Sequence, residues 1–113
     1  MTYVKINDTL YPASISGRMS DGEWDRRESK SIRLEMSYAD AMALFVDELD
    51  WAIVYQEDSY VNDNGETITP EATVYDNSVF CVAGAITDNR DGTVTVKMGK
   101  PTSDDILAVI IGG

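Results

Sequence analysis

Residues 30–47, KSIRLEMSYADAMALFVD, contain the transition that decides the expected fold. Apolar and polar residues alternate in the first half, which is typical of a strand with one buried and one wet face; the apolar side has Ile32, Leu34 and Met36. Ser37 follows directly and is suited to cap a helix, with Asp40 three positions later. The segment therefore predicts a strand and then a helix at about Tyr38–Asp47 that lies on the sheet. Its apolar residues recur at helical spacing, at Ala39, Met42, Ala43 and Val46.

Short apolar runs on both sides of this segment predict the other strands. Before it, Tyr3–Ile6 and Thr9–Tyr11 flank Asn7-Asp8, a two-residue hairpin turn. Pro12 has no main-chain N–H, so we expect the second strand to be an edge strand or bulged. Later strands are predicted at Trp51–Gln56, Val74–Tyr75, Val79–Ile86 and Thr93–Met98. Between the first two of these, Asn64-Gly65 predicts a protruding hairpin ribbon within residues 58–72.

These elements predict a single α+β domain over residues 1–113. We expect a largely antiparallel sheet of five to six strands, one helix after the third strand, and a short C-terminal helix. Thr102 or Ser103 can cap that last helix over residues 104–111. The β-branched residues of the same segment leave a final strand as the alternative.

The composition excludes several kinds of chemistry. The 113 residues include no histidine, one cysteine, 20 acidic and 9 basic side chains, for a net charge of −11. A histidine-based triad, a Cys/His zinc site and a disulfide framework are therefore excluded. The cysteine, Cys81, lies in an apolar run that disfavours its thiolate. Residues 60–71 fail as a calcium loop because Tyr60 occupies the first ligand position. We predict no enzyme activity, no cofactor and no metal site.

The charge is distributed unevenly along the chain. Residues 34–89 carry twelve acidic side chains and no lysine or arginine, whereas residues 1–33 carry six basic and five acidic ones. This stretch is either a solubilising surface or a negative face for a basic partner. Within it, Asp47, Glu48 and Asp50 cluster after the expected helix and are candidate partner-binding residues. The net charge argues against direct binding to nucleic acid or to an anionic membrane.

The other candidate partner-binding residues are aromatic or lie in the expected ribbon. Trp24 is a candidate anchor for a protein interface. Its neighbouring arginines would also suit stacking on a nucleic-acid base, although the acidic residues between them favour local ion pairing. Tyr60, Asn64 and Gly65 belong to the ribbon, which suits contacts by strand addition. Three further aromatic residues are either interface anchors or core residues: Trp51, Tyr55 and Tyr75.

Several segments together carry a resemblance to a known group of proteins. They are residues 20–28 (SDGEWDRRE), 32–39 (IRLEMSYA), 44–45 (LF), 51–56 (WAIVYQ), 64–70 (NGETITP) and 91–101 (DGTVTVKMGKP). The chain resembles small uncharacterised proteins encoded in prophages of gut Firmicutes, often in tail-gene modules. This resemblance offers no catalytic motif to transfer.

The resemblance implies a phage-encoded, non-enzymatic protein that is located in the virion or the host cytoplasm. We expect a minor structural or assembly component of a tail or virion that acts through protein contacts, self-assembly into a homo-oligomer included. The alternative is an acidic anti-defence protein that binds a basic host nucleic-acid-binding protein as a nucleic-acid mimic. Mimicry needs the acidic residues of 34–89 on one face, and the sequence leaves that open.

Overall fold

The computed structural model describes residues 1–102, which form nine strands and one helix. Seven strands make one antiparallel sheet in the order β7-β4-β1-β2-β3-β9-β8, and β5 and β6 make a separate pair. The bounds are β1 Thr2–Ile6, β2 Thr9–Asp21, β3 Arg27–Glu35, α1 Tyr38–Leu44, β4 Ala52–Tyr55, β5 Tyr60–Val61, β6 Thr67–Ile68, β7 Thr73–Asp76, β8 Val82–Asp88 and β9 Thr93–Gly99.

The expected α+β class, with a sheet of five to six strands, is wrong. Residues 1–102 are mostly β, with 52% of them in strands and one helix of seven residues. Strand β2 is one continuous strand of 13 residues, which runs through Pro12 and ends at Asp21. The predicted C-terminal helix over residues 104–111 lies outside the described residues.

The helix begins where the sequence predicts and ends earlier. Ser37 caps it, because its Oγ accepts the Asp40 N–H at 3.1 Å. Phe45 then adopts an extended conformation and turns into the core, so the helix stops at Leu44. The predicted apolar face is also wrong: Ala41 is buried, whereas Met42 is 55% exposed and lies on the outside.

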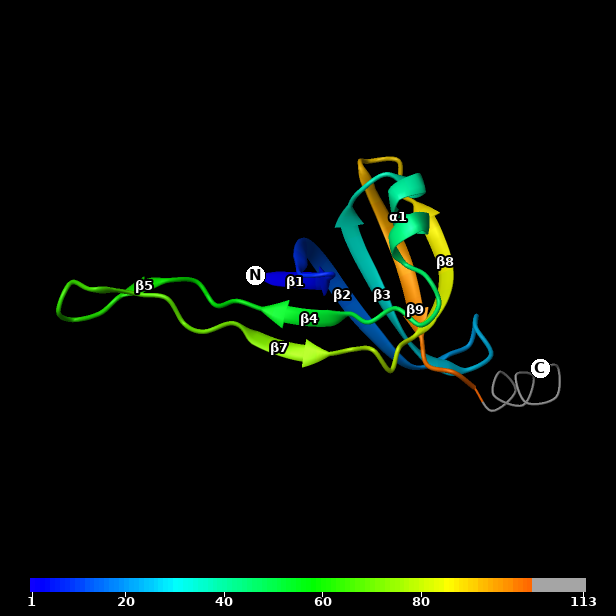
Figure 1. Ribbon diagram of the computed structural model, residues 1–113, viewed down its shortest axis with the longest axis horizontal. Helices are drawn as coiled ribbons and strands as arrows, with labels where there is room; N and C mark the ends of the chain where they lie inside the picture. Colours follow the sequence, from blue (N-terminus) through cyan, green and yellow to red (C-terminus); the bar gives the residue numbers. More distant parts are fainter. Residues whose placement is uncertain (103–113) are drawn as a thin grey trace.

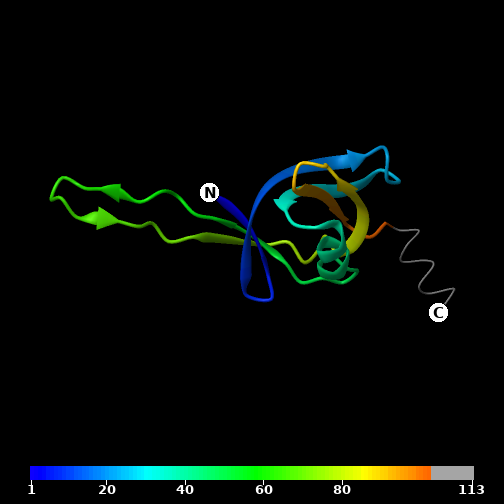
Figure 2. The same cartoon turned by 90° about the horizontal axis from the view of Figure 1, so that it is seen from above.

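The sheet has one apolar face and one polar face. The apolar face is covered by α1 and by two buried aromatic residues, Trp51 and Phe80, joined by a hydrogen bond from Trp51 Nε1 to the Phe80 carbonyl. Figure 2 shows β2, β3, β9 and β8 curving around α1. The strand residues at the centre of this core are Val4, Ile6, Ile32, Leu34, Val94, Val96 and Met98. The cross-strand register places hydroxyl and basic side chains on the opposite face: Ser14, Ser16, Ser31, Arg33, Thr95 and Lys97.

Strand β2 is shared by two parts of the sheet, and Pro12 marks where they meet. Residues 9–12 of β2 pair with β1, and pairing with β3 begins at Ala13, opposite Leu34. At the two-residue turn Asn7-Asp8 both residues have positive φ, and this turn makes Ile6 and Thr9 a hydrogen-bonded pair. Along β2, the main-chain groups of successive residues then point alternately toward β1 and toward β3. By that alternation, the Pro12 nitrogen points toward β3, where it has no hydrogen to donate. Of the two predicted alternatives for β2, the edge strand is wrong, because Pro12 lies in a central strand at the end of one ladder. An irregular register does occur in β2, between Arg18 and Asp21 and not at Pro12.

The turn between β2 and β3 is organised by a buried carboxylate, that of Asp21. Its Oδ2 accepts hydrogen bonds from Ser29 Oγ and Lys97 Nζ, each at 3.0 Å, and its Oδ1 accepts the Glu23 N–H at 3.0 Å. The hydrogen bond from Lys97 is the main cause that lowers the pKa of Asp21 to about 2, against an opposing effect of burial. This side chain thus ties β2, β3 and β9 together.

Trp24 lies in the same turn and covers two glycines of neighbouring strands. A Cβ atom on Gly99 would lie 2.7 Å from the indole Cζ3, and one on Gly84 would lie 2.6 Å from Cη2. The Arg27 guanidinium stacks on the indole, 4.5 Å from the ring centroid, and donates a hydrogen bond from Nε to the Trp24 carbonyl. Both glycines are required by this close approach and not by a turn.

We expect the Asp21 carboxylate to make the free energy of unfolding depend on pH in the acidic range. Because its pKa is about 2 in the fold and near 3.8 otherwise, its contribution is complete above pH ~4 and is lost as the pH falls toward ~2. Asp21→Asn should flatten this part of the stability curve, measured by denaturant unfolding across that pH range. Asp63→Asn, at an exposed ribbon position, is the control and should retain the slope. Parallel curves for the wild type and Asp21→Asn would contradict the assignment.

We expect Gly99→Ala to destabilise the fold by about 1–3 kcal/mol, since the added methyl group overpacks against both Trp24 and the Arg27 side chain. Gly17→Ala is the matched strand control, because the nearest atom to its Cβ would be the Ser29 carbonyl oxygen at 3.9 Å. Thermal unfolding measures both variants. In a Trp24→Ala background the Gly99→Ala penalty should decrease but not vanish, because the Arg27 Cδ atom would still lie 2.7 Å from the added Cβ. An unchanged penalty there would refute the contact with Trp24.

Candidate interaction site

Residues 56–72, here called the ribbon, extend away from the body of the molecule as a twisted hairpin (Figures 1 and 2). The molecule measures 64 × 30 × 26 Å along its principal axes. The pairing of Tyr60 with Ile68 continues the register of β4 and β7, in which Tyr55 pairs with Thr73. The ribbon is therefore an extension of the β4–β7 hairpin.

The tip of the ribbon is held by its own turn. Asn62 Oδ1 accepts the N–H groups of Asn64 and Glu66, each at 3.0 Å, and Gly65 adopts a φ of +76°. This confirms the hairpin predicted from Asn64-Gly65. Among the described elements, β5 and β6 contact each other and no other element. The ribbon is thus formed without support from the core.

The side chains of the ribbon are acidic and partly apolar. It carries five carboxylates, at Glu57, Asp58, Asp63, Glu66 and Glu71, and no lysine or arginine. Tyr60 is 55% exposed and Val61 is 67% exposed. At its base, Tyr55, Val74 and Tyr75 are also exposed. Exposed apolar side chains grouped in this way are typical of a surface that binds another molecule.

Strand β7, at the base of the ribbon, is a free edge of the seven-stranded sheet. The Asn77 N–H donates to the Trp51 carbonyl, so the residues of β7 that face β4 are the odd-numbered ones. The main-chain groups of Val74 and Asp76 therefore point away from the sheet. All four residues of β7 are exposed, and none is a proline or a lysine.

The opposite edge, β8, is covered along its first residues. Asp47 Oδ1 accepts the Ala83 N–H at 2.8 Å, and the Glu48 N–H donates to the Cys81 carbonyl at 2.6 Å. The register of β8 against β9 also shifts between Ala83 and Ile86. Side-chain capping and an irregular register both hinder addition of another strand. Of the two edges of this sheet, β7 is the accessible one.

The partner-binding residues predicted from sequence do not come together. Tyr60, Asn64 and Gly65 lie on the ribbon, whereas Trp24 belongs to the β2–β3 turn at the opposite end of the molecule (Figures 1 and 2). Asp47 and Glu48 cap β8. Asp50 is exposed beside Trp51, in a hollow of about 330 Å³ that also has Lys5 and Asp76 on its wall. A partner-binding role for each of them stays a prediction.

The acidic residues of 34–89 are divided between the ribbon and the body of the molecule. Five lie on the ribbon, and others are distributed over the body: Glu35 at the end of β3, Asp40 on α1, and Asp88 at the end of β8. In the β2–β3 turn, by contrast, acidic and basic residues pair locally, as Arg18 does with Asp21 and Arg27 with Asp25. The concentration of negative charge is therefore a property of the ribbon.

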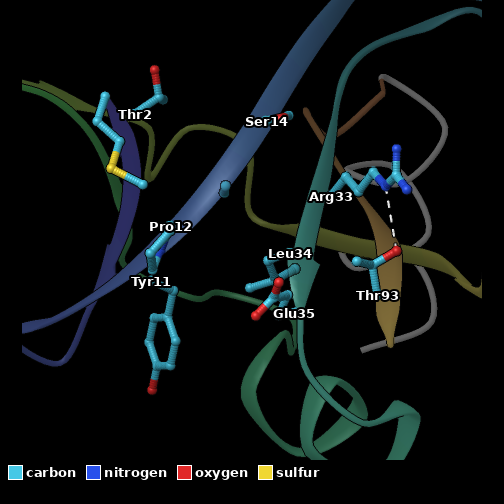
Figure 3. A pocket seen from close by; sticks show the side chains of 10 residues that line it. Thr2, Tyr11, Pro12, Ser14, Arg33, Leu34, Glu35 and Thr93 are labelled. Atoms are coloured by element: carbon cyan, nitrogen blue, oxygen red, sulfur yellow. Dashed lines mark hydrogen bonds between the residues drawn. The ribbon is translucent and has the colours of Figure 1, made fainter. Parts of the chain in front are cut away.

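A hollow of about 740 Å³ lies at the junction of β1, β2 and β3 near Pro12. Figure 3 shows Arg33 on its wall with a hydrogen bond from Nε to Thr93 Oγ1. Arg33 also pairs with Asp91 at 2.7 Å, so its charge is already compensated. The hollow is shallow and holds no nucleophile paired with a base.

Comparisons with other proteins add nothing to this geometry. No protein-family model, curated protein or solved structure matches the chain. Within residues 1–102, no group of three or more acidic or cysteine side chains is placed to hold a metal ion. The helix in that range is too short to cross a membrane.

Sequence reasoning missed two parts of this site. The exposure of Val61 and Val74 was not anticipated, because β-branched residues in a strand usually indicate packing. The free edge of β7 was missed as well, since it depends on pairings between residues far apart in the chain. Strand β7 itself carries no signal of an edge, because Thr73–Asp76 contains neither the lysine nor the proline that often marks an edge strand.

We expect the ribbon to be dispensable for folding. Replacing residues 58–70 with Asn-Gly closes the β4–β7 hairpin at the pair formed by Glu57 and Glu71, with a two-residue turn. The free energy of unfolding should change by no more than about 1 kcal/mol, because the core makes no contact with β5 or β6. Denaturant unfolding followed by far-UV circular dichroism measures this. A loss of cooperative unfolding would show that the ribbon supports the body.

Proposed function

We propose that this chain is a non-enzymatic, phage-encoded structural or assembly component of a tail or virion, which binds other proteins through its ribbon. The observation that carries the proposal is the ribbon itself, whose strands β5 and β6 contact each other and no other described element. Ordering a segment costs conformational entropy that internal packing normally offsets. Here a partner protein supplies the missing contacts.

The chemistry of the ribbon suits a protein partner. Tyr60 and Val61 present apolar surface at its middle, and carboxylates flank them on both strands. Exposed tyrosines are frequent anchors of protein interfaces, and surrounding charges steer the encounter and select the partner. The body of the protein holds the ribbon in place through the shared β4–β7 register.

The nucleic-acid mimic is the second candidate, and the five carboxylates of the ribbon favour it. A mimic requires a continuous acidic face. On the body, the acidic residues belong to several separate elements, which does not favour such a face. Steeply salt-dependent binding to a host nucleic-acid-binding protein, together with absence of the chain from phage particles, would make the mimic the better description.

We expect the chain to be present in purified phage particles. Particles from cells that carry the gene, separated on a density gradient, should contain the chain by mass spectrometry. The variant with residues 58–70 replaced by Asn-Gly should fold but be lost from the particles by about tenfold or more, because each 1.4 kcal/mol of lost contact lowers occupancy tenfold. Particles that lack the wild-type chain and assemble normally without its gene would contradict the proposal.

A further inference from the structure

We propose that β7 and the acidic ribbon beside it form an acceptor for an extended, lysine- or arginine-rich segment of the partner protein, which pairs with β7 as an added strand. This inference rests on the proposed function and specifies the chemistry of the partner. Its two components are the free main-chain groups of β7 and the unbalanced negative charge around them.

The main-chain component is at Val74 and Asp76. The N–H and carbonyl groups of these residues point away from β4, by the alternation that the hydrogen bond from Asn77 to Trp51 fixes. A second observation gives the same orientation. Met1 and Gln56, next to β1 and β4, exchange main-chain hydrogen bonds, so the even-numbered residues of β4 face β1 and its odd-numbered residues face β7. An extended segment that binds at β7 would take up these groups as a strand does.

The negative charge beside β7 indicates that the partner segment is positively charged. Asp76 ends β7, and Glu71 precedes the strand by two residues; residues 34–89 contain no lysine or arginine. Lys5 shares a hollow with Asp76 and pairs with Asp8 at 3.8 Å, so the charge at this edge stays negative overall. Hydrogen bonds from the Ser78 hydroxyl and N–H lower the pKa of Asp76, which keeps its carboxylate ionised. A second copy of this chain would bring the same negative charges to the edge, whereas a basic segment would neutralise them.

The shortness of β7 makes both components necessary. Four residues offer only two outward-pointing positions, so main-chain pairing alone gives weak and unselective binding. The exposed side chains of Val74 and Tyr75 lie on opposite faces of the strand and allow apolar residues of the partner to pack on either side. A segment that alternates basic and apolar residues matches this arrangement.

A synthetic peptide of alternating lysine and valine is the probe, and its binding to the full chain is measured by fluorescence anisotropy. We expect binding at low salt that weakens as the NaCl concentration rises from about 0.05 M to about 0.5 M. Val74→Pro removes one outward N–H without removing a bond to β4, so it should weaken binding about fivefold or more. Val74→Thr retains the N–H and is the matched control.

A second readout does not depend on a protein variant. A peptide with the same charges but with alternate main-chain amides N-methylated cannot form the ladder, and should also bind about fivefold more weakly. Equal binding of both peptides, equal binding by Val74→Pro, or no binding of the lysine peptide to the wild type would each overturn the inference. Because the particle experiment removes the ribbon and leaves β7 intact, a negative result here is distinguishable from failure of the proposed function.

Discussion

Pro12 has no main-chain hydrogen to donate, and the pairing of β2 with β3 ends at its neighbour Ala13. Because this ladder stops there, β3 is free to leave the sheet after Glu35 and enter α1, which covers the apolar face. On the other side of Pro12, β2 pairs with β1, and the sheet continues through β4 to β7 without a covering helix. The missing donor thus marks where β2 changes its pairing partner from β3 to β1, the strand that leads through β4 to β7 and the ribbon.

The far end of β2 is held by a different kind of contact. Asp21 joins β2, β3 and β9 through hydrogen bonds that leave its carboxylate buried but compensated, as a buried charge requires. Trp24 adds apolar coverage, and it fits only because Gly84 and Gly99 have no side chains. Pro12, near the start of β2, therefore marks where this strand changes its pairing partner from β1 to β3. Asp21, at the end of β2, holds the turn that leads into β3.

Features encoded by neighbouring residues could be predicted from the sequence, and features encoded by distant contacts could not. The Ser37 cap, the Asn7-Asp8 turn and the ribbon at Asn64-Gly65 depend on a few adjacent residues, and all three are confirmed. The phase of α1 was mistaken because its buried face depends on Phe45, which turns inward beyond the last helical residue. The position of β2 and the free edge at β7 depend on strand pairing across the whole chain. The sequence therefore indicated the residues of the ribbon but not the edge strand beside it.

The alignment of the ribbon with its supporting strands has a mechanical consequence. Strands β4, β7 and β1 run along the long axis of the molecule, in the direction in which the ribbon extends (Figure 1). A force that pulls on the tip of the ribbon therefore acts parallel to the β1–β4 ladder, where Thr2 to Lys5 pair with Ala52 to Tyr55. The hydrogen bonds of that ladder are loaded together in shear and not one after another. The ribbon is accordingly anchored as a tether that resists tension.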